Sequence, residues 1–446
     1  MNTVLCISGV CKRWNRAALA CPSLWQYVAF STASRSSMGR ASTFLKRSGE
    51  SPLFLYASGV HSRSSGASFP ISATARHLFQ LISTETCRLY ACHLVSPPLE
   101  LRMVLINPAP NLRHLFIRGD GKDYCRAITF QNTPRIETLS LAGCGMRSLN
   151  LLESLTTLDI GNYSFSGRLS LRRLLQALEA TPRLRHLTLR RFFNFSAPVY
   201  FHQCVPMTQL RTIGLEFCDT VFILSHLALP PAVSVVINHD RFLPTDTIVS
   251  CFPPSSNRGS FLPGSRHIDI ELFSGHPEYS LFVDARSGSR VSLRARVHHF
   301  MREDAWLLRS LEALPSSPLF SSVHSLTIRT DVRHIPWSGL LFQLARLSHL
   351  DVLCSDWAPL FNGLMAKHLD GVQRTRSGIT TLSLGMDPQF NNFDHSHLRA
   401  CVCRLIRADP PLERISLMTQ TWEQMKREDP FWETLVHSVG MLPLNH

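Results

Sequence analysis

A short pattern of apolar positions recurs along most of the chain: an apolar residue, two positions of any kind, an apolar residue, one further position and a third apolar residue. The alternation inside each copy is typical of a strand that buries one face. Clear copies are NLRHLFI (111–117), RIETLSL (135–141), LTTLDI (155–160), RLRHLTL (183–189), QLRTIGL (209–215), SVHSLTI (322–328), HLDVLCS (349–355), GITTLSL (378–384) and PLERISL (411–417). Weaker copies are AVSVVIN (232–238) and RHIDIEL (266–272).

The copies are spaced as in a repeat protein. Their central apolar residues are 24, 19, 29, 26 and 23 residues apart in the first part of the chain, and 27, 29 and 33 apart in the last part. Leucine-rich repeats have a period of roughly 20–29 residues. An ordinary α/β sheet protein also carries such strands, but the shared phase favours a leucine-rich-repeat-like solenoid. The central residues are Leu115, Leu139, Leu158, Leu187, Ile213 and Val236, then Leu326, Leu353, Leu382 and Ile415.

Helical segments between the copies predict return helices. In LSLRRLLQALEATP (169–182), Leu171, Leu174, Leu175 and Leu178 form one helical stripe that ends before Pro182. The phase of the repeats is lost between 239 and 321. There we predict irregular repeats with an insertion, including an exposed loop over 251–266 and a helix over 300–314.

The first residues of the chain show a different pattern. Apolar residues at Ile7, Val10, Cys11, Trp14 and Ala18 have the spacing of one helical face, with basic residues on the other side. This predicts one helix, which Pro22 ends before Leu24 and Trp25 add two more large apolar side chains.

This segment resembles the C-terminal half of an F-box. The likeness is carried by Val10-Cys11-Lys12-Arg13-Trp14 and by the spacing to Ala18, Pro22, Leu24 and Trp25, and it is closest to the F-box-like proteins of mushroom-forming fungi. The segment STFLKRSGESPLFLYAS (42–58) resembles that family's helix ending in Arg-Ser-Gly, followed by a Pro-Leu that opens the first strand. Irregular leucine-rich repeats downstream are also what that family carries.

The resemblance implies a role in ubiquitin ligation. In the family the F-box binds the Skp adaptor of a cullin-based ligase, and the repeats select the protein to be ubiquitinated. Alternatively, both tryptophans only pack against the first repeat strands. The residues that the resemblance assigns to adaptor binding or to the core of the box are Ile7, Val10, Cys11, Trp14, Ala18, Pro22, Leu24 and Trp25.

One departure from the family pattern concerns the start of the box. The family's F-box opens with a Leu-Pro-x-Glu segment and an apolar helix, whereas this sequence has Met1 in the middle of the module. We therefore expect that the N-terminal half of the F-box is missing, either because an upstream exon is absent from the sequence or because the box is degenerate. In a degenerate box, Ile7, Val10 and Trp14 would form an exposed apolar patch.

Together these patterns predict an α/β fold: a partial helical F-box module followed by a leucine-rich-repeat-like solenoid of parallel strands with return helices. We expect a partial F-box-like helical segment over 1–30 and the first part of the repeat region over 31–238. Irregular repeats with a loop insertion follow over 239–321, and the C-terminal part of the repeat region covers 322–446.

Charge and cysteine content add little to this picture. The net charge is +14, and only 5 of the 46 basic residues are lysines. The arginine excess reflects either nucleotide composition or the binding of acidic or phosphorylated partners; because the arginines are scattered, it does not predict nucleic-acid binding. The 13 cysteines form no disulfide framework, which favours reduced thiols in the cytoplasm or nucleus. The most apolar stretch, 221–237, contains two prolines, so we predict no membrane span.

Motifs for catalysis are missing from the sequence. The patterns GxxxxGK[ST], GxGxxG, HExxH and GxSxG do not occur. A cluster of His395, His397, Cys401 and Cys403 has partial metal-ligand spacing, but the apolar stripe through Cys401 favours a place in the core. We therefore predict no enzyme, cofactor or metal.

These expectations lead to one main functional hypothesis. The chain is predicted to be the substrate-recognition subunit of a Skp–cullin–F-box ubiquitin ligase, with the Skp adaptor, the cullin core and an unidentified target protein as partners. The alternative is a leucine-rich-repeat scaffold that binds proteins without a ligase role and has a vestigial F-box. A nucleic-acid binder would instead require the arginines to converge on one face.

Overall fold

A computed structural model gives the fold of the chain, which divides into two compact units, Met1–Leu210 and Arg211–His446. Each unit is described by itself. The structure describes residues 2–59, 73–96, 107–119, 133, 135–143, 153–161, 171–191, 204–216, 218–230, 233–239, 247, 250, 267–272, 278–285, 289–296, 309–310, 312–313, 324–330, 335, 337–344, 346–354, 358–369, 379–386, 399–400, 402–403, 407, 413–417 and 440–441.

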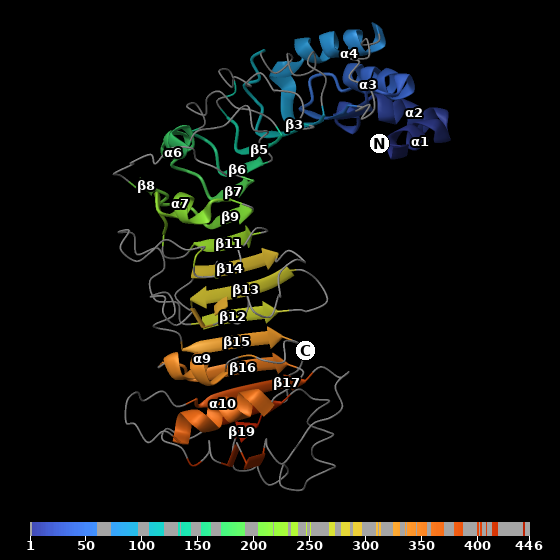
Figure 1. Cartoon of the computed structure of the whole chain (residues 1–446). Coiled ribbons are helices and arrows are strands. Elements are labelled where there is room, and N and C mark those ends of the chain that lie inside the picture. The colour runs from blue at the N-terminus through green and yellow to red at the C-terminus, as the bar shows by residue number, and fades with distance from the viewer. Residues whose placement is uncertain are drawn as a thin grey trace. The chain divides into compact units, whose positions relative to one another are not determined.

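The first unit is built on parallel strands that pair in chain order (Figure 1). Each strand lies beside the next one in the sequence, so the chain must return to the same end of the sheet after every strand. This arrangement is an α/β fold with a parallel sheet, consistent with a solenoid-like fold. The strands are β1 (Tyr27–Ser31), β2 (Leu53–Ser58), β3 (Leu89–Val95), β4 (His114–Arg118), β5 (Thr138–Ala142), β6 (Thr157–Gly161) and β7 (His186–Arg190), and a short β8 (Val205–Pro206) follows.

The register of these strands aligns the apolar positions of the sequence pattern into continuous buried rows. The first row contains the central apolar residue of each copy, and the second row contains the last apolar residue of each copy. The remaining row contains the first apolar residue of each copy, just before the strand begins. All these side chains are almost fully buried. The strands therefore share one core along the unit. The rows are Leu115, Leu139, Leu158 and Leu187; Ile117, Leu141, Ile160 and Leu189; and Leu112, Ile136, Leu155 and Leu184.

Helices cover the buried side of this sheet at its first and last turns. α3 (Arg35–Arg47) connects β1 to β2 and packs against β1, and α4 (Ala73–Thr84) with the 3₁₀ turn η2 (Thr86–Arg88) connects β2 to β3. α6 (Leu171–Glu179) precedes β7. The helix expected over 169–182 is thus confirmed, and Leu174, Leu175 and Leu178 of its stripe are buried.

The N-terminal segment differs from the single helix expected from its periodicity. It forms α1 (Asn2–Val10), α2 (Lys12–Leu19) and the 3₁₀ turn η1 (Pro22–Trp25), with Cys11 in an extended conformation between the two helices. Glycine, valine and cysteine favour a helix weakly, and the break falls directly after Gly9 and Val10. Strand β1 then precedes the strand that Leu53 opens, so the prediction that the latter is the first strand is wrong.

The second unit continues with a sheet that is parallel at both ends. Its strands lie in the order β9, β11, β14, β13, β12, β15, β16, β17, β18 and β19 (Figure 1). The helices described in this unit are α7 (Thr220–Leu224), α9 (Trp337–Gln343) and α10 (Ala358–Leu369). The strands are β9 (Thr212–Glu216), β10 (Leu227–Ala228), β11 (Ser234–His239), β12 (His267–Leu272), β13 (Glu278–Ala285), β14 (Ser289–Arg296), β15 (Ser325–Thr330), β16 (His349–Cys354), β17 (Thr381–Met386), β18 (Arg414–Leu417) and β19 (Gly440–Met441).

The loss of phase after residue 239 has a clear counterpart in this sheet. The chain passes from β11 to β12, which is not its neighbour, and returns through the antiparallel strand β13 to β14, which pairs with β11. This three-strand excursion takes the place of regular repeats. The predicted loop over 251–266 lies outside the described residues, as does most of the helix expected over 300–314.

Two central residues of the repeat pattern are shifted from their expected positions. In β11, Val235 pairs with Ile213 and is buried, whereas Val236 is half-buried. In β16, Leu350 takes the corresponding position and Leu353 does not. In both strands one apolar residue, Val236 or Leu353, lies on the otherwise polar open face, so the apolar pattern also fits a shifted phase.

A backbone hydrogen-bond pattern repeats where the strands begin. One carbonyl accepts two N–H groups from the following repeat: the carbonyl of Arg113 binds the N–H groups of Glu137 and Thr138 at 2.8 and 2.9 Å. The same geometry recurs in both units, so the repeats share one backbone frame. The other accepting carbonyls belong to Glu137, Thr156, His324, Ser348 and Thr380.

Candidate protein-binding surfaces

The first candidate surface is apolar and lies on the N-terminal helices. Val10 is 68% exposed, Trp14 53%, Leu19 47% and Leu24 38%. We call these four residues the N-terminal apolar surface. Large apolar side chains gathered on one short exposed segment are typical of a protein–protein contact.

A second tryptophan anchors this segment to the repeats. Trp25 is fully buried, and its ring meets Phe44 of α3 edge-on with 4.9 Å between the ring centroids. The indole Nε1–H donates a hydrogen bond to the carbonyl oxygen of Ala18 at 2.8 Å, and the guanidinium carbon of Arg47 lies 4.5 Å from the ring centroid. The C-terminal end of α2 is therefore fixed to α3 through Trp25.

The eight residues predicted for adaptor binding or for the box core thus fall into two groups. Val10, Cys11, Trp14, Pro22 and Leu24 are exposed, whereas Ala18 and Trp25 are buried. The side chain of Ile7 lies outside the described part of the structure. Trp14 is too exposed for the alternative in which both tryptophans pack against the repeats.

The Arg-Ser-Gly sequence at the end of α3 has a structural role at each position. Arg47 covers the ring of Trp25, and Ser48 is fully buried and donates a hydrogen bond to the carbonyl oxygen of Leu45 at 2.7 Å. Gly49 has a φ angle of +52°, which favours glycine, and it reverses the chain next to Pro22. The motif therefore ends the helix and places its turn against η1.

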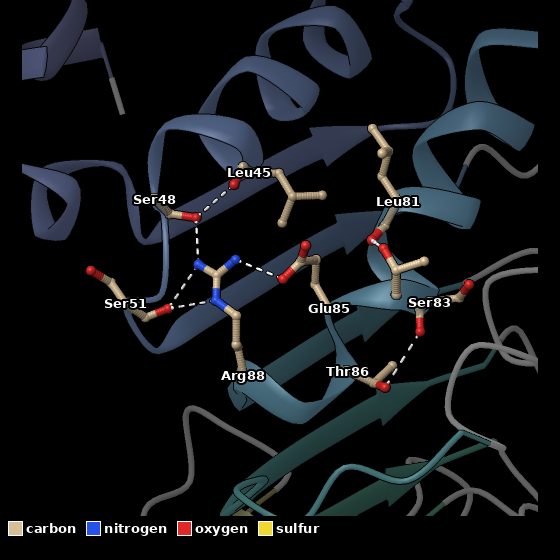
Figure 2. A network of polar contacts seen from close by, with 9 residues as sticks. Leu45, Ser48, Ser51, Leu81, Ser83, Glu85, Thr86 and Arg88 are labelled. Carbon is tan, nitrogen blue, oxygen red and sulfur yellow. Dashed lines mark hydrogen bonds and ion pairs between the residues drawn. The ribbon is translucent and has the colours of Figure 1, made fainter.

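Arg88 fastens this turn to the next repeat (Figure 2). Its Nη2 donates hydrogen bonds to Ser48 Oγ at 2.7 Å and to the carbonyl oxygen of Ser51 at 2.9 Å, and its Nε also binds that carbonyl. Its Nη1 pairs with the Glu85 carboxylate at 2.7 Å. Since Arg88 is largely buried, this network links η2 directly to the turn that supports the N-terminal helices.

The second candidate surface is a set of aromatic rings on the open face of β1–β4. One row stacks Tyr27 on Phe54 and continues through Tyr90 to His114, with centroid distances of 4.7, 5.3 and 5.5 Å. A second row runs from Tyr56 through His93 to Phe116, at 4.9 and 5.5 Å. These distances are typical of aromatic contacts. We call these seven residues the aromatic strand face.

A cavity of about 460 Å³ opens on the aromatic strand face. Its walls include rings of both rows, and its floor includes Val28, Leu55 and Cys92. Burial raises the pKa of the Cys92 thiol to about 12, so this thiol stays protonated. Partial burial lowers the pKa of His93 below its ordinary value, so the imidazole is neutral at pH 7. The cavity is therefore apolar and uncharged.

The same face becomes polar further along the first unit. Ser140 Oγ donates a hydrogen bond to the Asp159 carboxylate at 3.1 Å, and Arg190 pairs with the same carboxylate at 3.5 Å. At the start of the strands, Arg113 pairs with Glu137 and also lies over the ring of Tyr90. The aromatic strand face is thus bordered by ion pairs whose carboxylates already have partners.

Sequence analysis did not identify the aromatic strand face. The segments YVAFS and LFLYAS carry aromatic residues at positions where the later copies of the pattern have threonine, serine or aspartate. This difference is a usable signal once the strands are aligned in register. β1 and β3 were not among the predicted strands, so that alignment was missing.

Metal and membrane sites are not seen in the described part of the chain. The residues that the structure describes contain no group of three or more histidine, cysteine, aspartate or glutamate side chains that could hold a metal ion. Of the predicted cluster, Cys403 is half-buried, and His395, His397 and Cys401 lie outside the described residues. None of the described helices has the length and apolar character needed to cross a bilayer.

Comparison of the chain with protein-family models finds no match, and comparison with curated proteins finds none.

Proposed function

We propose that this chain is the substrate-recognition subunit of a Skp–cullin–F-box ubiquitin ligase. In this proposal the N-terminal apolar surface docks on the Skp adaptor, and the repeats, which we assign as leucine-rich, hold the target protein. The observation that carries the proposal is the contrast between the two tryptophans: Trp25 is buried and fixes the segment, whereas Trp14 is half exposed. A fixed scaffold that presents an exposed tryptophan is the arrangement expected of a docking site.

Further support comes from the fit between this segment and the sequence resemblance. Val10, Trp14 and Leu24, three of the four residues of the N-terminal apolar surface, carry the likeness to the C-terminal half of an F-box. The Arg-Ser-Gly motif, which extends the likeness, joins that segment to the first repeats through Trp25 and Arg88. The proposed F-box segment and the repeats therefore form one connected piece.

The proposed mechanism is positional. The adaptor-bound subunit holds its target near the ubiquitin-conjugating enzyme and so raises the local concentration of the acceptor, without chemistry of its own. The small number of lysines, 5 in the whole chain, supports this role because it limits the sites at which the subunit would itself be modified.

Adaptor binding is tested by titrating the full chain with the Skp adaptor of the same host. We expect Trp14→Ala to weaken binding at least tenfold, as for a hot-spot residue. Thr138→Ala, on the open face of β5, should leave binding unchanged. Trp25→Ala does not suit this test, because removing a fully buried tryptophan costs about 3–5 kcal/mol of stability.

A cysteine footprint adds an independent readout. Iodoacetamide should modify the exposed Cys11 in the free chain, and bound adaptor should protect it because Cys11 lies between Val10 and Trp14. The buried Cys92 should stay unmodified in both samples and serve as the internal control. If the adaptor neither binds nor protects Cys11, the chain is better described as a repeat scaffold without a ligase role.

A further inference from the structure

We infer that the aromatic strand face binds an extended segment of the target protein, with a bulky apolar side chain in the cavity and an acidic residue beside it. The inference rests on the proposed role of the repeats in target binding and names the chemistry of the target. It is carried by three properties of this face: exposed aromatic rings, the size of the cavity and the charges around it.

The rings of this face are not needed to fill the core. Tyr27 is 56% exposed and Tyr56 is 44% exposed, while the opposite face of the same strands already buries Val28, Phe30 and Leu55. The following strands β5 and β6 place Thr138, Ser140, Thr157 and Asp159 on the same open face, and these strands pair in the same way. The aromatic residues of β1–β4 are therefore available to a partner.

The size and lining of the cavity suit a large apolar side chain. Binding cavities for small groups range from about 300 to 1,000 Å³, and this one has about 460 Å³. The rings of Tyr56 and Phe116 lie on either side of the neutral imidazole of His93. A phenyl, indole or isobutyl group entering this space would meet mostly carbon, which favours burial of an apolar group.

The charges around the aromatic strand face favour an acidic residue beside the bulky apolar residue of the bound segment. Strands β1–β4 contain no carboxylate, and their one arginine, Arg118, is exposed two positions after Phe116. Among the residues that the structure describes, the acidic side chains that border the face, Glu137 and Asp159, are already paired with Arg113 and Arg190. In the described part of this face, a carboxylate of the bound segment would therefore meet Arg118 without competition from an acidic side chain, and the net charge of +14 also attracts acidic partners.

Other polymers fit these observations less well. Sugars stacked on aromatic rings also require amide or carboxylate side chains that bind their hydroxyl groups, and the strands β1–β4 carry none. A single-stranded nucleic acid uses aromatic stacking together with a basic groove that follows its backbone. One arginine in four strands does not supply such a groove, so a protein segment is the occupant that this face favours.

The test uses the full chain and a positional-scanning library of octapeptides, with a labelled eight-residue uridine oligonucleotide as a second probe. We expect selection of phenylalanine, tryptophan or leucine at one position and of aspartate or glutamate next to it. Binding of the selected peptide should fall at least tenfold in Tyr56→Ser and in Phe116→Ala. In Arg118→Ser the acidic preference should disappear while the apolar preference remains.

Two control variants distinguish peptide binding at this face from a general effect on the sheet and from adaptor binding. Thr138→Ala, on the neighbouring strand of the same face, should leave peptide binding unchanged and exclude a general effect on the sheet. Trp14→Ala should weaken adaptor binding at least tenfold and retain peptide binding, so that failure of either proposal is recognised by itself. The inference is overturned if no residue class is selected, if basic residues are selected, or if the oligonucleotide binds more tightly and depends on Tyr56.

Discussion

Individual side chains decide how the N-terminal helices are joined to the repeats. Ser48 and Gly49 were noted in the sequence because of a family resemblance, but the residue that holds their turn, Arg88, lies about 40 positions later. Pairing over such a distance leaves no periodic signal in one sequence. The exposed and buried tryptophans were likewise indistinguishable by spacing, because α2 ends at Leu19 and Trp25 lies in the separate turn η1.

Replacing Arg88 tests the importance of this network. Arg88→Ala removes the donors to Ser48 and Ser51 and should lower the free energy of unfolding by about 2 kcal/mol. Arg88→Lys should recover only part of this loss, because an ammonium group cannot reproduce the two-pronged geometry. Urea unfolding followed by far-UV circular dichroism measures both effects.

The matched control is Glu85→Gln, which removes only the partly exposed ion pair of the network. Its cost should stay below about 1 kcal/mol. Equal losses for Arg88→Ala and Glu85→Gln would show that the bonds to Ser48 and Ser51 add no stability.

Secondary-structure elements were predictable where one face of a strand is apolar and the other polar. Each of the eleven copies of the apolar pattern overlaps a strand of the structure, and the stripe before Pro182 is the helix α6. Prediction failed where the open face also carries an apolar residue, as at Val236 and Leu353, because the apolar pattern then fits a second phase. Strand β1 was missed for the same reason, since four of its five residues are apolar and it follows directly after a helical pattern.

Helix packing in the second unit can be tested with two glycines. A methyl group on Gly339 of α9 would have no neighbour within 4 Å, whereas on Gly363 of α10 it would lie 2.7 Å from Trp337 Cβ. Gly339→Ala should therefore raise the free energy of unfolding by about 0.5–1 kcal/mol through helix propensity alone.

Gly363→Ala should instead lower it by about 1–3 kcal/mol, because α9 and α10 must move apart. Thermal unfolding of the full-length variants, followed by circular dichroism, compares the two. A stabilising effect of Gly363→Ala would show that the two helices do not pack as closely as described.

For the chain as a whole, the fold class could be predicted from the sequence, but the aromatic strand face could not. Parallel strands in chain order with return helices were expected from the repeat, and the α/β fold with a large parallel sheet is confirmed. The excursion through β12, β13 and β14 was visible in the sequence only as a loss of phase. The aromatic strand face stayed hidden because it depends on residues that the apolar pattern leaves free to vary.

In a sheet of this kind each strand contacts only its neighbours, so we expect a destabilising substitution to lower the stability of the adjacent strands alone. Leu139→Ala opens a cavity in the buried row of β5 and should cost about 2–5 kcal/mol of local stability. Amide hydrogen exchange measured by mass spectrometry should then become faster in β4, β5 and β6 and remain unchanged in β15, β16 and β17. Thr138→Ala, on the open face of β5, is the control that should change neither region.

Equal acceleration of exchange in β16 would contradict this expectation. It would show that the repeats unfold as a single cooperative body.

The carbonyl groups that accept two N–H bonds at the start of the strands have a consequence for how such a chain varies. They belong to arginine, glutamate, threonine, histidine and serine residues, and both N–H bonds that they accept come from the backbone. The hydroxyl groups of Thr156, Ser348 and Thr380 add a further bond to the carbonyls of the preceding repeats. The backbone part of the frame therefore requires no particular side chain at these positions. Mutation can replace the side chains around a binding face while the strands keep their spacing, so a new recognition specificity can arise without a new fold.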